Sequence, residues 1–343
     1  MPIINSKKSP SSRDTTNWGI IGLGHIAHKF AADLKLIPNA TLHAVASTSG
    51  ERAQNFAAQH DAYHYYDSYN GILDCPELDV VYIATRHPQH CETTLMCLEN
   101  NIPVLCEKPL AMNAHEVQKM IAAAQENDTF LMEALWTRFL PTIAKVLELI
   151  EAGTIGDVTA VKADFGFKAN PDPNSRLFNQ AEGGGALLDI GIYPLFISLL
   201  LLGQPKTIKT MTTFGKTKVD ETISMLLQYA DNKTANLQAT ILNTTPTEAY
   251  IFGTKGAIRM NTRWHEATSL TLLLDDAEPK NIFFEFIGYG YNYEAKAMME
   301  YLDKGVIEHP LMPHDFSLQL IQLLDKVRAE AGIVYPEYDH ISS

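Results

Sequence analysis

Cysteine is scarce in this chain of 343 residues, and the few cysteines present follow no recognisable pattern. None of them forms a CxxC pair, and they allow too few bridges for a disulfide-held scaffold: Cys75, Cys91, Cys97 and Cys106. Such thiols are typical of a reducing compartment, so we expect a cytoplasmic protein.

Positively charged residues are also fewer than negatively charged ones. The chain has 27 lysine and arginine residues against 40 aspartate and glutamate residues, which gives a net charge of −13. Because the phosphate backbone of a nucleic acid repels a protein of this charge, we expect no nucleic-acid partner.

Long apolar runs are missing as well. The longest uncharged apolar stretch, Ile190–Leu202, contains a glycine and a proline and is too short to span a bilayer. Residues 1–17 are polar and lack the apolar core of a signal peptide, so we expect a flexible N-terminal tail there. Together these features predict a protein with no membrane partner.

The apolar residues that are present suffice for buried cores. Hydrophobic residues make up 46% of the chain and charged residues 20%, which excludes a disordered or fibrous protein. At roughly 150 residues per domain, the length predicts two domains or one large one. From residue 18 to 152, short apolar strands alternate with helical patterns, and strands are expected at residues 18–22, 41–46, 80–85, 104–106 and 130–132. This repetition predicts right-handed βαβ crossovers and an α/β domain with a Rossmann-type, doubly wound parallel sheet.

From residue 153 to 343 the pattern changes to longer strands with few helices between them. Strands are expected at residues 158–167, 208–214, 222–229, 234–242, 250–253, 270–274 and 282–286. This succession predicts an α+β domain with a large, mainly antiparallel open sheet. One face of such a sheet packs on helices, and the other is free for a partner.

The segment Gly22-Leu-Gly24-His-Ile-Ala27 follows the first expected strand and opens the first expected helix. Gly22 permits the tight turn, Gly24 lets the backbone approach a pyrophosphate, and Ala27 allows close helix–strand packing. Because a helix N-terminus binds anions, Gly22, Gly24, His25, Ile26 and Ala27 are candidate cofactor contacts. A lone motif of this kind also fits a plain tight turn, but the strand–helix context favours a dinucleotide.

The second expected strand ends in Ser47-Thr48-Ser49, with Arg52 just beyond it. An NAD site usually has an acidic residue at this strand end for the ribose 2′-hydroxyl. Hydroxyl groups and an arginine suit a 2′-phosphate instead, so NADP is predicted. NAD stays possible because Glu51 lies close by, and Arg52 also fits a solvated helix position.

His87 and His90 lie just past the third expected strand, in His87-Pro-Gln-His90-Cys91. Ligands bind at the carboxyl ends of parallel strands, which favours contacts from these imidazoles to the cofactor or the substrate. It is equally consistent that His87 caps the helix begun by Pro88 and that His90 lies on its surface. A structural zinc site needs four ligands and no second Cys/His cluster follows, so we expect no metal.

Two further segments carry side chains suited to proton chemistry. Lys108 ends the fourth expected strand, where a lysine can exchange a proton or donate to a substrate oxygen, although a surface lysine would look the same. Asp189 and Tyr193 are four residues apart and share one face of an otherwise apolar helix. They need polar partners there, supplied either by an active site or by a buried Tyr–Asp network. Pro194 is expected to kink this helix and free the carbonyl of Ile190.

Three of these segments together resemble the Gfo/Idh/MocA oxidoreductases: the glycine fingerprint, Glu107-Lys108-Pro109, and the Gly183-Gly-Gly run that leads to Asp189 and Tyr193. The resemblance covers residues 18 to about 332. Within the family, the run Met132-Glu-Ala-Leu-Trp-Thr-Arg-Phe139 is similar to a branch of dihydrodiol dehydrogenases and NADP-dependent D-xylose dehydrogenases.

The resemblance implies roles for individual residues. Lys108 would be the active-site lysine at a cis Lys–Pro bond, and Asp189 would orient the site. The substrate would be contacted by His87, His90, Lys108, Trp136, Phe165, Asp189 and Tyr193. The remaining cofactor contacts would come from Thr85, His87, His90, Glu107, Lys108 and Trp136. Because that branch dimerises through the open sheet, a homodimer is expected.

The implied reaction is the oxidation of a sugar or cyclic diol. The substrate carbon would give a hydride to the nicotinamide while Tyr193 takes the hydroxyl proton and Lys108 stabilises the tyrosinate. Two alternatives stay open: a non-enzymatic NAD(P)-sensing regulator, and a glycosidase or epimerase that re-uses a bound NAD. A regulator has no need for Lys108, Asp189 and Tyr193 together.

Overall fold

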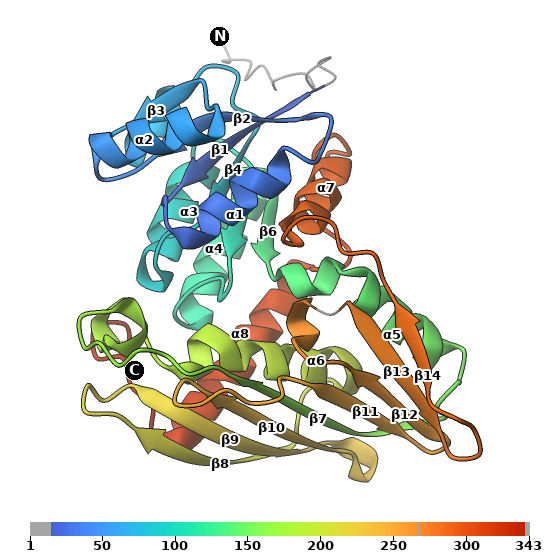
Figure 1. Cartoon of the computed structure of the whole chain (residues 1–343). Coiled ribbons are helices and arrows are strands. Elements are labelled where there is room, and N and C mark those ends of the chain that lie inside the picture. The colour runs from blue at the N-terminus through green and yellow to red at the C-terminus, as the bar shows by residue number, and fades with distance from the viewer. Residues whose placement is uncertain (1–14, 267, 340–343) are drawn as a thin grey trace.

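A computed structural model describes residues 15–266 and 268–339 of the chain, so most of the expected N-terminal tail lies outside the described residues. The first strand begins at Thr16, within the segment expected to be tail. Two sheets, each covered by helices, lie one above the other in Figure 1, with the first half of the chain in the upper part.

The upper sheet has six parallel strands in the order β3-β2-β1-β4-β5-β6. They are β1 (Thr16–Ile21), β2 (Ala40–Ala46), β3 (His64–Tyr66), β4 (Val80–Ile83), β5 (Val104–Glu107) and β6 (Leu131–Ala134). Every residue of β4, β5 and β6 is buried, which explains why their sequences are apolar apart from Glu107 and Glu133. The edge strand β3 was not expected, because three partly exposed residues carry no apolar signal.

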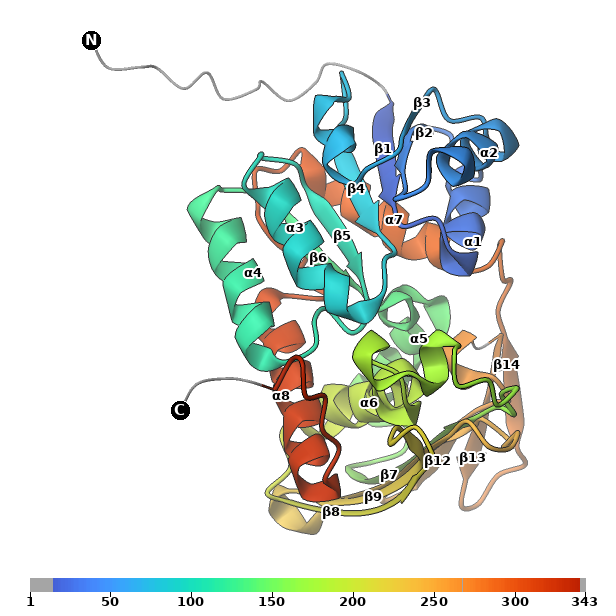
Figure 2. The same ribbon diagram turned by 90° about the vertical axis from the view of Figure 1, so that its left-hand side faces the viewer.

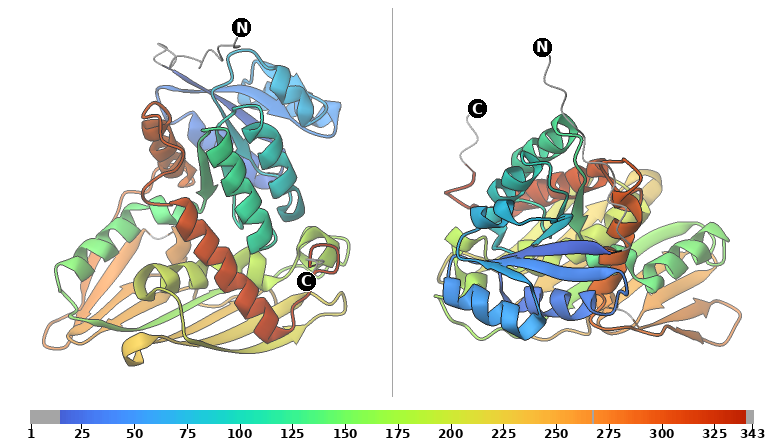
Figure 3. Two further views of the ribbon diagram at one scale, coloured as in Figure 1. Left: turned by 180° about the vertical axis from the view of Figure 1, so that it is seen from behind. Right: turned by 90° about the horizontal axis from the view of Figure 1, so that it is seen from above.

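Helices cover both faces of this sheet (Figure 2). They are α1 (His25–Leu34), α2 (Gly50–His60), α3 (His90–Leu98) and α4 (Ala114–Glu126). The rear view in Figure 3 places α3 and α4 on the face opposite α1 and α2. The predicted doubly wound sheet is therefore confirmed, and the reversal of strand order between β1 and β4 marks its ligand-binding edge.

The lower sheet has eight strands in the order β14-β13-β12-β11-β7-β10-β9-β8, and all neighbours are antiparallel except β7 and β10. They are β7 (Val158–Gly166), β8 (Thr207–Phe214), β9 (Asp220–Gln228), β10 (Thr234–Thr240), β11 (Ala249–Gly253), β12 (Gly256–Met260), β13 (Ser269–Leu274) and β14 (Lys280–Phe283). The mainly antiparallel open sheet is confirmed. β12 was not expected, because it follows β11 after a turn of only two residues.

One face of the lower sheet packs on helices, and Figure 1 shows its other face uncovered. The covering helices are α5 (Pro141–Glu151), α6 (Ile192–Leu202) and α8 (His314–Ala331). The helical run Gln180–Leu202 is apolar and long enough, by length and composition, to cross a bilayer. However, 78% of its most apolar window is buried by the rest of the fold, as in the core helix of a folded domain.

The chain returns to the upper sheet after β14. Helix α7 (Tyr291–Leu302) packs against α1, and Asp33 of α1 accepts hydrogen bonds from the backbone nitrogens of Tyr289 and Tyr291 at 2.7 and 2.8 Å. The long helix α8 then touches α4 and β6 above and β8 below. The two parts are thus joined by several passages of the chain.

Candidate active site

The turn after β1 places Gly22 and Gly24 at the ligand-binding edge. Gly22 has a φ of +87°, and a Cβ there would lie 2.6 Å from the backbone nitrogen of Thr85. A Cβ on Gly24 would meet no described atom within 4 Å. Gly24 is the N-cap of α1, which has no capping side chain among the described residues and no acidic residue in its first turn. This helix terminus and the space beside it fit the pyrophosphate of a dinucleotide.

The neighbouring side chains agree with that fit. Thr85 follows β4, and its buried hydroxyl has no hydrogen-bond partner among the described residues. In the first turn of α1, His25 is exposed, Ile26 is half-buried and Ala27 is packed against the sheet. The predicted cofactor contacts of this turn therefore lie together, and an unpaired hydroxyl is available to a ligand.

Two of the residues predicted to recognise the adenosine end, Ser49 and Arg52, line one surface pocket. The Ser47 hydroxyl is buried and accepts from the nitrogen of Ser49 at 3.3 Å, and the Ser49 hydroxyl caps α2 by accepting from the nitrogen of Arg52 at 3.4 Å. Thr48 is exposed between them. The pocket is lined by His28, Ser49, Glu51, Arg52, Asn55, Phe56 and Gln59. Arg52 forms no ion pair with any described residue, so its guanidinium is free for an anion.

Lys108 follows β5, and a hydrogen bond from its side chain reaches the helical segment that carries the other two predicted catalytic residues. It precedes the predicted cis bond to Pro109, and its Nζ donates to the main-chain oxygen of Asp189 at 2.6 Å. Asp189 lies in a π-helical turn, Leu187–Gly191, that leads into α6. An i→i+5 pattern would pair its carbonyl with the nitrogen of Pro194, which has no hydrogen. The carbonyl available to Lys108 is therefore that of Asp189, whereas the α-helical spacing had pointed to Ile190.

The carboxylate of Asp189 holds two cations. Arg176 Nη2 lies 3.0 Å from Asp189 Oδ1, and Lys108 Nζ lies 3.8 Å from the same oxygen. Burial alone would raise the pKa of Asp189, but Arg176, Lys108 and His87 outweigh burial and hold that pKa well below its ordinary value. Asp189 is thus charged and orients Lys108. Arg176 was not singled out, because the short helix that it begins, Arg176–Phe178, carries no motif.

Tyr193 is the buried phenol of the site. Its oxygen accepts a hydrogen bond from Trp136 Nε1 at 2.9 Å, and Lys108 Nζ lies 5.1 Å from its ring centroid. Burial first, and then the charge of Glu107, raise the pKa of Tyr193 well above its ordinary value, while the bond from Trp136 acts in the opposite direction. The phenol therefore keeps its proton, and because Trp136 uses only a lone pair, that proton is free for a substrate oxygen.

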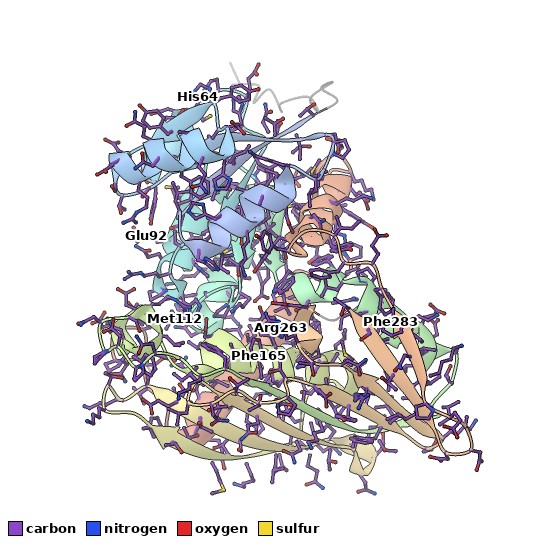
Figure 4. All side chains as sticks on the ribbon, in the orientation of Figure 1. His64, Glu92, Met112, Phe165, Arg263 and Phe283 are labelled. Carbon is purple, nitrogen blue, oxygen red and sulfur yellow. The ribbon has the colours of Figure 1, made fainter. Side chains whose placement is uncertain are left out.

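Aromatic rings surround Tyr193. Phe165 of β7 lies 5.5 Å from the Tyr193 ring and stacks on His265 at 4.0 Å, and Tyr291 stacks on Trp136 at 4.9 Å. Figure 4 places Phe165 and the nearby Arg263 where the upper and lower parts meet. Sequence patterns missed His265 and Tyr291, because neither lies in a motif and only folding brings them to the site.

Two predicted contacts, His90 and Glu107, are instead engaged in holding the site together. Both ring nitrogens of His90 face main-chain oxygens, at 2.8 Å from Pro109 and 3.2 Å from Thr85, and burial lowers the pKa of His90 to about 4. His90 is fully buried, so this geometry corrects its predicted contact with a ligand. Glu107 accepts from the Tyr82 hydroxyl and from the nitrogen of Lys108, so each of its carboxylate oxygens already has a protein partner.

Among the described residues, His87 forms a hydrogen bond through one of its two ring nitrogens. Its Nδ1 lies 3.3 Å from the oxygen of Gly183, and its neighbour Cys91 is 3.8 Å from the oxygen of Glu116. These contacts point the side chains of the His-x-x-His-Cys segment to separate partners and not to a shared ion. Among the described residues, another group of possible metal ligands lies at the edge of the upper sheet: His43, His64 and Cys75.

The fold and the site define a two-domain oxidoreductase that binds a nicotinamide dinucleotide. Residues 16–135 match the oxidoreductase family with an NAD-binding Rossmann fold, and residues 143–259 match the GFO/IDH/MocA C-terminal domain. The chain belongs to the Gfo/Idh/MocA oxidoreductase family. The resemblance seen in the sequence is thereby confirmed.

Similar proteins are found in several vertebrates. The chain is 37% identical to trans-1,2-dihydrobenzene-1,2-diol dehydrogenase of Mus musculus over 332 residues, which is 93% of this chain and 98% of that protein. It is 36% identical to the protein of the same name from Xenopus tropicalis over 333 residues, which is 94% of this chain and 99% of that protein.

Solved structures share the fold. An aldose-aldose oxidoreductase from Caulobacter crescentus, complexed with glycerol, has a TM-score of 0.85 and 23% identity, covering 93% of this chain and 98% of that one. A 3-ketoreductase from Actinomadura kijaniata, in complex with NADP and TDP-benzene, has a TM-score of 0.83 and 24% identity, covering 92% and 98%.

Proposed function

We propose that this chain is an NADP-dependent dehydrogenase that oxidises a ring hydroxyl of a cyclic diol or a sugar, with Lys108, Asp189 and Tyr193 as its catalytic group. The observation that carries the proposal is the hydrogen-bonded arrangement around Tyr193 and Lys108, on a fold whose relatives at 36–37% identity are dihydrodiol dehydrogenases. A regulator that only senses the cofactor has no use for this arrangement.

Each member of the group has a distinct task. When bound, the nicotinamide exchanges the hydride with the substrate carbon. Tyr193 holds a proton at its oxygen and gives it to a carbonyl in the direction of reduction. In the direction of oxidation Tyr193 must accept that proton, and the Trp136 N–H and the nearby Lys108 cation stabilise the tyrosinate. Asp189 keeps Lys108 in place.

The preference for NADP rests on the pocket beside α2. Arg52 lines it without an ion-pair partner among the described residues, and hydroxyl groups replace the acidic residue usual in NAD sites. We expect Arg52→Gln to weaken NADPH binding about tenfold, or about 1.4 kcal/mol, and to leave NADH binding unchanged. An equal effect on both cofactors in fluorescence titrations would contradict this assignment.

The reaction is tested by following NADPH formation from NADP+ with D-xylose, D-glucose and trans-dihydrodiols, beside the same panel with NAD+. Tyr193→Phe and Lys108→Met should abolish turnover and keep NADPH binding. Unchanged turnover in either variant would remove that residue from the mechanism. Co-purified cofactor without net NADPH formation would instead support the alternative of internal redox cycling, and absence of both would support a regulator.

A homodimer through the lower sheet is part of the proposal. Alternate residues of its strands point away from the covering helices, and four apolar ones lie on this open side: Met211, Leu226, Tyr250 and Phe252. Met211 is 81% exposed and Leu226 is 59% exposed in the single chain. We expect the double variant Met211→Glu/Leu226→Glu to sediment as a monomer, while Leu36→Glu on the upper part stays dimeric. If the wild-type protein sediments as a monomer, the proposal of a homodimer is wrong.

A further inference from the structure

His265 is a buried polar residue among the aromatic side chains around Tyr193. The proposed mechanism gives His265 no role. It belongs to a short helix, Trp264–Glu266, and is 4% exposed. Its ring stacks on Phe165 and lies 5.4 Å from the ring of Tyr193 and 6.2 Å from that of Trp136. Its Nδ1 is buried and has no hydrogen-bond partner among the described residues. Buried polar atoms are normally paired, so this nitrogen calls for a partner.

The neighbours of His265 decide which nitrogen is free to accept. Its Nε2 lies 3.5 Å from Glu266 Oε1, and Glu266 in turn accepts from Arg263 Nε at 2.8 Å. Burial lowers the pKa of His265, so the ring is neutral, and the bonds from His265 and Arg263 overcome the effect of burial and lower the pKa of Glu266 to about 2. The carboxylate therefore holds the one ring hydrogen on Nε2 and leaves a lone pair on Nδ1.

We propose that His265 Nδ1 accepts a hydrogen bond from a second hydroxyl of the substrate, next to the one that reacts at Tyr193. The inference rests on the proposed function and narrows its substrate class to compounds with neighbouring ring hydroxyls. Phe165 and Trp136 supply apolar ring faces, which suit the carbon skeleton of such a ring but cannot pair a hydroxyl. His265 and Tyr193 add polar atoms beside these rings and can meet two adjacent oxygens.

A site built to pair a hydroxyl discriminates strongly against an analogue that lacks it, because its own polar atom is then left unpaired. The test compares kcat and KM for trans-1,2-dihydrobenzene-1,2-diol and D-xylose with those for their mono-deoxy analogues. In His265→Phe, which keeps the stacking on Phe165, the diol KM should rise at least tenfold, which corresponds to about 1.4 kcal/mol. The KM for the deoxy analogue should change less than twofold.

Two further variants separate a lost contact from a damaged fold. His265→Asn keeps a hydrogen-bonding atom near the Nδ1 position and should restore most of the diol KM. Glu266→Gln should raise the diol KM by less than His265→Phe, because only the orientation of the ring is loosened. Equal losses on both substrates, or no loss in His265→Phe, would overturn the inference. Absence of turnover by the wild-type protein would overturn the proposed function itself, which is a distinguishable result.

Discussion

The glycine turn allows a prediction that separates cofactor binding from folding. In Gly24→Ala the new methyl group meets no described atom within 4 Å, and the backbone of Gly24, at φ −90° and ψ −170°, suits alanine. Alanine restricts the unfolded chain, which stabilises by about 0.4–1 kcal/mol, but it is a poorer N-cap than glycine by a similar amount. The free energy of unfolding should therefore stay within about 1 kcal/mol of the wild-type value.

The same methyl group would occupy the open space beside Gly24 through which a pyrophosphate would approach the backbone. We expect the Kd for NADPH to rise at least tenfold, or about 1.4 kcal/mol, in a fluorescence titration. The matched control is Gly22→Ala, where φ is +87° and the added Cβ would lie 2.6–2.7 Å from backbone atoms of Ala84 and Thr85. Left-handed strain of about 1–2 kcal/mol and overpacking of about 1–3 kcal/mol should lower its stability by about 3 kcal/mol.

The two variants should thus fail in different assays. Gly24→Ala should unfold at the same denaturant concentration as the wild-type protein and bind NADPH poorly. Gly22→Ala should unfold at a lower denaturant concentration. If Gly24→Ala binds NADPH with the wild-type Kd, the cofactor does not lie against this turn and the assignment of the site is wrong.

Three more predictions concern groups away from the turn. Trp136→Phe keeps the stacking on Tyr291 but removes the N–H that stabilises the tyrosinate, so the pKa of Tyr193 should rise. The pH profile of oxidation, measured from pH 6 to 10, should therefore shift to higher pH. An unchanged profile would contradict the role of Trp136. Burial raises the pKa of Asp220 to about 7, so the folded state keeps a proton that the unfolded state releases above about pH 4, and stability falls as the pH rises through this window. Asp220→Asn should flatten the pH dependence of urea unfolding by up to about 1.4 kcal/mol per pH unit, and an equally steep dependence would show that Asp220 does not titrate there. Asp33→Ala removes the acceptor of three backbone nitrogens at the start of α7 and should cost about 3 kcal/mol in urea unfolding, whereas a loss below about 1 kcal/mol would show that water replaces the carboxylate.

Much of the fold could be predicted because the buried strands and the glycine turn have recognisable sequence patterns. The fully buried strand Val80–Ile83 is a continuous apolar run, and the segment from Gly22 to Ala27 encodes its own turn. The short strand β3 and the strand β12, which follows a two-residue turn, leave no comparable mark. Their place is set by pairing with neighbours, which sequence spacing alone does not contain.

The candidate site was predictable only where its residues sit in motifs. Lys108, Asp189 and Tyr193 lie in segments with recognisable spacing, and the structure brings them together. Arg176 and His265 reach the same place from two short helices, and the sequence around each of them contains no motif that would predict it. The role of His90 could be assigned only from the structure, because the two main-chain oxygens that face its ring nitrogens belong to different segments of the chain.

The return of α7 to the upper sheet has a consequence for how this molecule can be divided. A fragment that stops at residue 152 would contain α1 but not the helix that packs on it, and the buried carboxylate of Asp33 would lose its three donors. It would also lose α8, whose Arg328 donates to the oxygen of Met112 and whose Asp325 accepts from the nitrogen of Ala114. The nucleotide-binding half is therefore not a detachable module. A graft of this half onto another protein must therefore include α7 and α8, which come from the far end of the chain.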